Sequence, residues 1–308
     1  MQHRPGLGIS LILLMALCFA AMDSLVKLLG AHLSVLVLLW ARYAFQALVV
    51  GVWLLARGRA AFHARHPKFQ LLRGSLLTTA SVISFYGLQL MPVAEFTAVG
   101  MLSPVVVTLL AAIYLHESVS GFRWALVGCG FVGALIVIRP GSGVFGWAAA
   151  MPLLMALANG SFQALTARLA GLDNPLTTHF YTGLVGMLAM TPVLLLSGAD
   201  LPATLQAAPA WQLGLLLALV ALGTCGHLCL ILAMGQAPTS TLMPFAYAQI
   251  AFAVLGSGLL FGHLPDAWAW LGMAVIAASG ASTVWLNVRA AARLRRPIPA
   301  IAADPIAD

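Results

Sequence analysis

The sequence predicts an all-α polytopic membrane protein, with ten transmembrane helices arranged as two inverted five-helix repeats. Three observations carry this prediction. Hydrophobic residues make up 62% of the 308 residues and charged residues only 7%, whereas about 25% of the residues of a soluble domain are charged. Apolar runs of about 20 residues, the length that crosses the hydrocarbon core of a bilayer, recur along the chain. Finally, the two halves of the chain resemble each other.

The apolar runs are separated by charged residues, proline and glycine, and these breaks define the predicted spans. The first run is too long for the apolar region of a cleavable signal and contains Asp23, so it is expected to stay as a span. The runs between residues 71 and 115 are interrupted only by MPVAE, but their length requires two crossings. Ten spans result, at approximately residues 7–29, 35–55, 71–90, 94–115, 121–138, 146–168, 176–197, 211–235, 239–262 and 266–288.

Lysine and arginine concentrate in alternate connections and set the predicted orientation. With the N-terminus inside, twelve of the fifteen Lys and Arg residues lie in inner connections or tails, Arg73 among them. Because cytoplasmic loops carry the excess of Lys and Arg, we expect both termini to be cytoplasmic and the chain to lie in the inner membrane. Topology thus explains the net charge of +7, which argues against a nucleic-acid partner. Residues 289–308 form a basic, then Pro/Ala-rich tail, whose basic part is expected at lipid headgroups.

Two short matches reveal an internal repeat. LLMAL occurs at 13–17 and again at 153–157, an alignment that places Asp23 over Gln163. LHESVSGFRW at 115–124 resembles GHLPDAWAW at 262–270, which places Trp124 over Trp270. Each unit holds five spans, and an odd number means that the second unit enters the membrane from the opposite side, as in secondary transporters. The expected units are residues 1–142 and 143–288, followed by the tail at 289–308.

The segment LSPVVVTLLAAIYLHESVSGFRW at 102–124 resembles the signature region of the EamA domain. It has a proline, an apolar run with small residues, Leu-x-Glu, and a tryptophan seven positions after the glutamate. Two such copies in ten spans are similar to the drug/metabolite transporter superfamily. There are two departures from the pattern: His263 stands where a second glutamate is common, and Leu126 stands where a glycine is usual. The resemblance implies a transporter, and both departures concern span ends.

Charged residues inside predicted spans are the first candidates for a site, because a charge at mid-membrane costs about 2.5–3.5 kcal/mol on insertion scales. Asp23 and Arg42 fall at similar depth on consecutive antiparallel spans. Two interpretations follow: an ion pair that fixes the first two helices, or contact with a substrate or a coupling proton. Lys27, one turn further along, is expected at the membrane boundary, where its side chain can reach the headgroups.

Other polar residues carry lower weight. Glu95 sits at a short outer turn, where it is either a rim residue or functional. His227 is more readily a packed, hydrogen-bonded residue than a ligand. Glu117 and Arg123 flank an inner turn and are expected to have helix-end roles. The four cysteines fall in apolar runs and are interpreted as packing residues, so no metal site is predicted.

In the resembled superfamily the third, fourth, eighth and ninth spans line a central cavity, with the first and sixth beside them. This implies that residues of those spans contact the substrate. The lining residues implied by the resemblance are Tyr86, Gln89, Ser103, Tyr247 and Gln249, with Asn159 and Gln163 behind them.

The predicted function is secondary transport of a small organic metabolite by alternating access. Export of an amino acid or a related compound is placed ahead of import of a vitamin or nucleotide-like cofactor such as riboflavin. The sequence contains no Walker A motif, no cofactor is expected, and protons are a candidate coupling ion. An intramembrane enzyme is the rival class, but Ser120 occupies the position of the second His in H-E-x-x-H. The partners expected are the small-molecule substrate and the lipid bilayer, with the chain a monomer or a homodimer.

Overall fold

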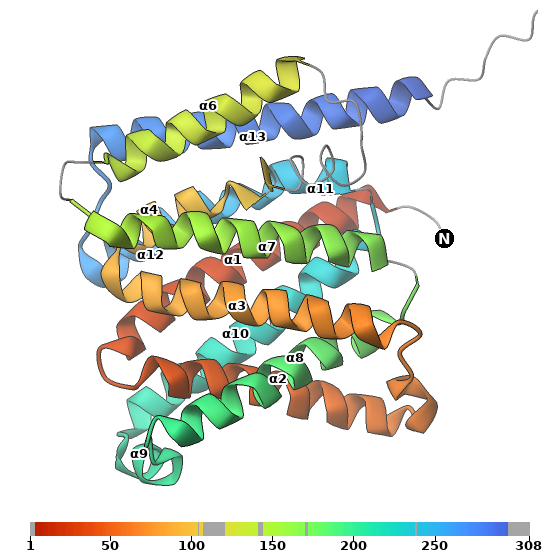
Figure 1. Cartoon of the computed structure of the whole chain (residues 1–308), viewed down its shortest axis with the longest axis vertical. Coiled ribbons are helices and arrows are strands. Elements are labelled where there is room, and N and C mark those ends of the chain that lie inside the picture. Colours follow the sequence, from red (N-terminus) through yellow and green to blue (C-terminus); the bar gives the residue numbers. More distant parts are fainter. Residues whose placement is uncertain are drawn as a thin grey trace, which may run out of the picture.

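The structure, a computed structural model, describes residues 4–103, 105–106, 121–140, 144–169, 172–237 and 239–294, and every regular element in this part of the chain is a helix (Figure 1). The long helices run roughly parallel or antiparallel and form one bundle. The elements are α1 (Pro5–Gly30), α2 (Val35–Ala56), η1 (Arg59–Phe62), α3 (Pro67–Leu90), α4 (Val93–Gly100), α6 (Gly121–Ile138), η2 (Gly146–Ala149), α7 (Ala150–Leu169), α8 (Pro175–Leu196), α9 (Leu201–Ala207), α10 (Ala210–Met234), α11 (Thr239–Ala246), α12 (Ala248–Phe261) and α13 (Ala267–Leu294).

The all-helical membrane class is confirmed. Seven helical segments of the described residues are long and apolar enough to cross a membrane, and two shorter apolar helices, Trp124–Ile138 and Ala267–Ser282, occupy the expected fifth and tenth spans. The expected fourth span begins as α4, and its later part lies largely outside the described residues. Glu117, for which a helix-end role is expected, also lies outside them. The ten-helix inverted repeat stays a prediction at this point.

Local sequence explains where several helices begin and end. Pro5, Pro67 and Pro175 stand in first turns, where the missing proline N–H costs nothing. The Asn174 side chain accepts a hydrogen bond from the Leu176 N–H at the start of α8. At its C-terminal end, α12 stops at Gly262, whose φ of 64° is a left-handed conformation that glycine adopts without strain.

Two helices break in the middle of a predicted span. The eight residues of α4 end at Gly100 and are followed by a turn at residues 101–102. The eight residues of α11, which contain Pro244, end at Ala246, and α12 resumes at Ala248. Proline removes one backbone hydrogen bond and favours such a break. The two interrupted helices stand at corresponding places in the two predicted units.

Helices of the first unit pack mainly on helices of the second. α1 lies against α10 and α12, and α3 lies against α7 and α8. α2 pairs with α8 at one edge of the bundle, and α6 pairs with α13 at the other (Figure 1). In the predicted span order these contacts are first with eighth, third with sixth, second with seventh and fifth with tenth. Exchange of the two units maps this pattern onto itself.

Candidate functional site

A small polar cavity lies at the centre of the bundle, between the two units. It has a volume of about 90 Å³. Helices α1, α2, α3, α4, α7, α10 and α12 all contribute side chains to it. Its lining combines aromatic and sulfur-containing side chains with a charged and polar set, which is Asp23, Arg42, Ser81, Ser84, Thr97, Asn159, His227 and Gln249.

Asp23 is the acid of this cavity. Its side chain projects from the second half of α1 and is 8% exposed. The amide nitrogen of Gln249, at the start of α12, lies 3.4 Å from its Oδ2. Thr97 of α4 lines the same cavity. Asp23 is thus held beside both interrupted helices, where backbone ends and polar side chains can meet a ligand.

Arg42 is the base of the cavity, and it is 1% exposed. Its Nη1 donates to Ser81 Oγ at 2.7 Å, and its Nη2 lies 2.6 Å from His227 Nε2. A guanidinium can only donate, so His227 Nε2 must be the acceptor, which makes this histidine neutral. Among the described residues, the Arg42 Nε has no hydrogen-bond partner. The rings of Tyr43 and Phe85 flank the guanidinium at 4.7 and 5.8 Å.

Of the two interpretations for Asp23 and Arg42, the direct ion pair is not formed between these two described side chains. Both side chains reach the same cavity, as their predicted depths required. Among the described residues, however, no Lys, Arg or His nitrogen lies within 4 Å of the Asp23 carboxylate. The reason is that Arg42 points toward Ser81 and His227, while Asp23 points toward Gln249. The two charges therefore face the cavity separately.

Lys27 has a different role from the one expected at the membrane boundary. Its Nζ donates to the carbonyl oxygens of Leu88 and Met91, at 2.8 and 2.9 Å. These carbonyls end α3, where the helix dipole and unpaired acceptors favour a cation. Gln89, expected in the cavity, instead donates to the Val26 carbonyl at 3.0 Å. Both side chains fasten α1 to the end of α3.

Glu95 is buried rather than placed at an open rim. It lies in the first turn of α4 and is 4% exposed. Its Oε1 is 3.0 Å from Nε2 of His263, which follows α12 and is partly exposed, and its Oε2 has no hydrogen-bond partner among the described residues. His263, where the family pattern has a glutamate, therefore meets the acid of the other unit. The pair joins the start of α4 to the end of α12.

Four other expected lining residues lie outside the cavity in this conformation. Tyr86 is 38% exposed on α3, because it faces away from the bundle. Ser103 donates to the Gly100 carbonyl and accepts from the Asn159 amide, at 2.8 and 3.2 Å, so it sits behind Asn159. The lining also does not include Gln163 or the buried Tyr247. Asp23, Arg42, Asn159, His227 and Gln249 are the predicted residues that the structure brings together.

Sequence reasoning missed Arg73 as a site residue. In the predicted topology it is counted with the inner connections, although it is the third residue of the span expected at 71–90. The helix begins at Pro67, so Arg73 falls in its second turn, with only 1% of its surface exposed. The signal that could have found it is Pro67, which favours the first turn of a helix. Ser81 and Thr97 were missed as well, since hydroxyl side chains are common in membrane helices.

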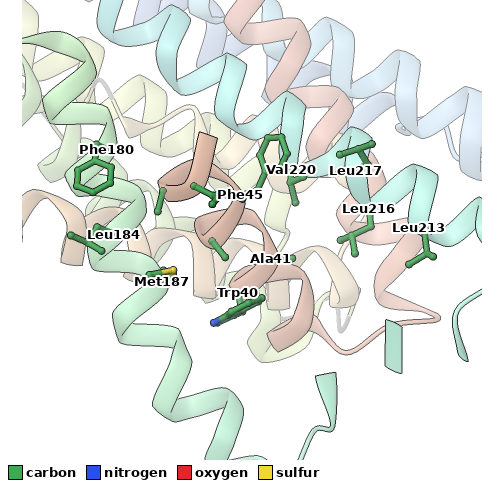
Figure 2. Close-up of a pocket in the computed structure, with 13 residues that line it drawn as sticks. Trp40, Ala41, Phe45, Phe180, Leu184, Met187, Leu213, Leu216, Leu217 and Val220 are labelled. Carbon is green, nitrogen blue, oxygen red and sulfur yellow. The ribbon is translucent and has the colours of Figure 1, made fainter. Parts of the chain in front are cut away.

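A second, larger cavity lies between α2, α8 and α10 and has a volume of about 650 Å³ (Figure 2). Figure 2 shows Phe45, Met187 and Val220 around it, and the rest of its lining is almost wholly apolar. Leu48 and Leu217 on its wall are 66% and 58% exposed, so it opens on the outer surface of the bundle. Despite its size, it lacks the convergent polar groups of a metabolite site. The polar central cavity is therefore the candidate site.

The size of the central cavity limits what it can hold in this structure. Its volume of about 90 Å³ is well below the roughly 300–1,000 Å³ of sites for drug-sized ligands. A metabolite of that size does not fit the cavity as it stands.

Comparisons with known proteins agree with the geometry. The model of the EamA-like transporter family matches residues 6–139. A riboflavin transporter from Rhizobium johnstonii is 31% identical over 235 residues, which is 76% of each chain. The chain belongs to the EamA-like transporter family. EamA relatives also include an S-adenosylmethionine uptake transporter from Rickettsia bellii, 23% identical over 85% of this chain and 87% of the relative.

The EamA relatives differ in what their names say they carry. The pseudopaline exporter CntI of Pseudomonas aeruginosa is 26% identical over 84% of this chain and 89% of the relative. A protein of known crystal structure superposes with a TM-score of 0.60 at 18% identity, covering 92% of this chain and 97% of the other, which shows the shared fold. The family and the named relatives are membrane transporters rather than enzymes.

Proposed function

We propose that this EamA protein is a secondary transporter that moves a small organic metabolite by alternating access, with riboflavin as the first substrate to test. The observation that carries the proposal is the small cavity with convergent polar groups between the two units. It is lined by an acid, a base, two amides and aromatic rings from seven helices. A site at such an interface can open to one side and then to the other without being rebuilt.

The proposed architecture is ten spans in two inverted repeats, residues 1–142 and 143–288. Two observations support it: the helix contacts that map onto themselves when the units are exchanged, and the paired breaks after α4 and α11. We further propose that the end of the bundle carrying Arg57, Arg59, Arg65 and Lys68, called the basic end below, faces the cytoplasm of the inner membrane.

Riboflavin is placed first because of both the relatives and the chemistry of the cavity. The Rhizobium relative shares 31% identity over three quarters of each chain. Phe19, Phe85 and Phe96 offer ring faces, and Asn159 and Gln249 offer amide donors and acceptors. Such a set suits a flat heteroaromatic ring with a hydrogen-bonding edge. On these two grounds we propose import of a vitamin ahead of the export of an amino acid that the sequence alone favours.

A second candidate substrate is S-adenosylmethionine, which also has a flat heteroaromatic ring. Asp23 favours it specifically, because a cavity-lining carboxylate with no cation within 4 Å among the described residues can pair with a sulfonium or ammonium group. Riboflavin is neutral and would use Asp23 only as a hydrogen-bond acceptor. The two candidates thus differ in how strongly they depend on the Asp23 charge.

The test is uptake by the purified protein in proteoliposomes, with riboflavin, S-adenosylmethionine and an amino-acid panel offered separately. We expect riboflavin uptake above that of protein-free vesicles, and a rise in the melting temperature of the protein with riboflavin, since a ligand stabilises the state that binds it. Uptake of S-adenosylmethionine alone would favour the second candidate. No uptake and no thermal shift with any compound would contradict the proposal.

The same vesicles test coupling to protons, which we propose to run through Asp23. Asp23 is the one carboxylate among the described residues that line the cavity. We expect an imposed pH gradient to increase the initial rate of wild-type uptake and to leave any residual uptake by Asp23→Asn unchanged. An equal response of both proteins to the gradient would remove Asp23 from the coupling step.

A further inference from the structure

Arg73 of α3 is a second buried guanidinium, distinct from Arg42 and not part of the central cavity. Its Nε donates to Thr166 Oγ1 of α7 at 2.7 Å, and its Nη1 donates to the Thr178 carbonyl and the Thr182 hydroxyl of α8. Its Cζ lies 4.7 Å from the centre of the Phe162 ring. Its Nη2 is buried and has no hydrogen-bond partner in the part of the chain that the structure describes. The side chain is almost wholly buried, and one of its nitrogens has no acceptor among these residues.

The charge of Arg73 has no counter-ion in the part of the chain that the structure describes. No carboxylate oxygen there lies within 4 Å of its guanidinium. Asp173, an acid at the same end of the bundle, instead accepts hydrogen bonds from the Gln70 amide at 2.8 Å and from the Arg65 backbone N–H at 2.9 Å. Buried charges are normally paired, because removing them from water is costly. An unpaired guanidinium with a free nitrogen can bind an anion.

The position of Arg73 places it on the way from the central cavity to the basic end. It stands in the second turn of α3, while its partners lie in the last turn of α7 and the first turns of α8. Ser81, which binds Arg42 at the cavity, is eight residues further along α3, or about 12 Å. Arg73 belongs to the first unit and all its hydrogen-bond partners to the second. Separation of the units at this end would therefore expose it.

We propose that Arg73 forms an anion-binding subsite between the central cavity and the basic end. When α3 parts from α7 and α8, the guanidinium exchanges its neutral threonine partners for a carboxylate or phosphate group of the passing molecule. The planar fork of arginine suits both groups, because its parallel N–H donors match the oxygens of a carboxylate or a phosphate. The proposal rests on the alternating access proposed above, and it adds a charged class of substrate, carboxylated or phosphorylated.

The first experiment measures the electrostatic field at this subsite with thiol reagents. Cys18, Cys129, Cys225 and Cys229 are replaced by alanine, and Thr166→Cys is introduced into the full chain. The purified protein reacts with two methanethiosulfonates of similar size, the anionic sulfonatoethyl and the cationic trimethylammonioethyl reagent, each normalised to its rate with 2-mercaptoethanol. We expect the anionic reagent to react about ten-fold faster than the cationic one beside an unpaired guanidinium. Arg73→Lys should keep this preference, and Arg73→Gln should abolish it.

Thr204→Cys serves as the control, because Thr204 lies on α9 at the opposite end of the bundle. Its reagent preference should not change with Arg73→Gln. A preference at Thr166→Cys that survives Arg73→Gln would overturn the proposal. Absence of any reaction at Thr166→Cys would do the same, since a guanidinium that never meets water is only a static tie between helices.

The second experiment asks which anion binds. Inorganic phosphate or acetate is added at constant ionic strength, with chloride as the reference, and the labelling rate of Thr166→Cys is measured. We expect at least one of the two to slow labelling with Arg73 present and not with Arg73→Gln, and the effective one identifies the group. If neither does, the subsite is refuted. If labelling behaves as proposed while riboflavin uptake fails, the riboflavin assignment falls and the subsite stands.

Discussion

The two halves of the chain share an architecture but differ in charge. Asp23, Arg42, Arg73 and Glu95, the four buried Asp, Glu, Lys and Arg residues in the described part of the molecule, all belong to the first half. The second half supplies neutral partners, which are threonine hydroxyls and a carbonyl for Arg73, His227 for Arg42 and Gln249 for Asp23. Glu95 meets the partly exposed His263. The buried charged side chains of the described residues thus lie in the first half, and the second half supplies hydrogen-bonding groups that contact them.

This asymmetry bears on how easily the halves can separate. Breaking a buried ion pair costs about 3–5 kcal/mol, because an uncompensated charge remains. A hydrogen bond between a charged and a neutral group contributes about 1.5–3 kcal/mol, and water or a substrate can replace the neutral member. Arg139 and Asp266 do form an ion pair across the halves at 2.7 Å, but it is partly exposed and joins α6 to α13 at one edge. In the proposed transport cycle, the cavity side opens while that edge stays together.

The largest effect is expected from the charge that lines the cavity. Asp23→Asn should abolish most riboflavin uptake by proteoliposomes and leave expression and membrane insertion unchanged, because it removes the carboxylate through which proton coupling is proposed and keeps the side-chain shape. Gln163→Asn, at the aligned position of the second half, is the matched control and should transport like the wild type. Equal losses in both variants, or unchanged uptake in Asp23→Asn, would show that the first half has no special role.

A double-mutant cycle between Arg42 and His227 tests the charged-to-neutral contact between the halves. Arg42→Gln, His227→Gln and the double variant should give a coupling energy of about 1.5–3 kcal/mol in equilibrium unfolding, the range for a hydrogen bond to a charged group. The same cycle with Asp23→Asn and Arg42→Gln should give a smaller value, since these side chains form no direct ion pair. A larger coupling for the Asp23 cycle would restore the ion-pair interpretation.

Two glycines, Gly133 and Gly272, allow α6 and α13 to pack closely at their edge of the bundle. A Cβ on Gly272 would lie 2.6 Å from the Gly133 carbonyl oxygen, so α13 could not stay as close to α6. We expect Gly272→Ala to lower the free energy of unfolding by about 1–3 kcal/mol, the usual cost of overpacking. Gly128→Ala, also on α6 but with no atom within 4 Å of its Cβ, should be nearly neutral. Similar losses for both would mean that this edge is not closely packed.

The smallest effect concerns Asp266, at the start of α13. The pKa of its carboxyl is lowered, first because it accepts the Ala269 backbone N–H and also because Arg139 is adjacent. The ionised carboxyl therefore stabilises the folded protein at pH values above 3.8, which is near the pKa of Asp266 in the unfolded chain. This stabilisation is lost as the pH falls through the lower pKa that Asp266 has in the folded protein. Asp266→Asn keeps a helix cap but not the charge, so its melting temperature should approach that of the wild type between pH 5 and pH 3. A difference that does not change with pH would contradict this.

How much of this could be predicted from sequence depends on the kind of interaction. The apolar runs predict the membrane helices, and the matching depths of Asp23 and Arg42 correctly place both at one cavity. Depth alone cannot tell which way a side chain points around its helix, so it could not show that Asp23 and Arg42 turn toward different partners or that Tyr86 faces away from the bundle in this conformation. The burial of Arg73 could not be predicted because helix starts are uncertain by two to four residues, and the start at Pro67 moves Arg73 from the first turn of the expected span to the second turn of the helix.

The central claim is that the two halves separate at the basic end, and a distance between spin labels there tests it most directly. Phe69→Cys on α3 and Leu172→Cys between α7 and α8 are both exposed, at 45% and 47%, and can be labelled in the protein without native cysteines. We expect the distance between the two spin labels to show two populations in a lipid membrane, with a ratio that riboflavin shifts. A single narrow distribution, unchanged with riboflavin, would contradict it.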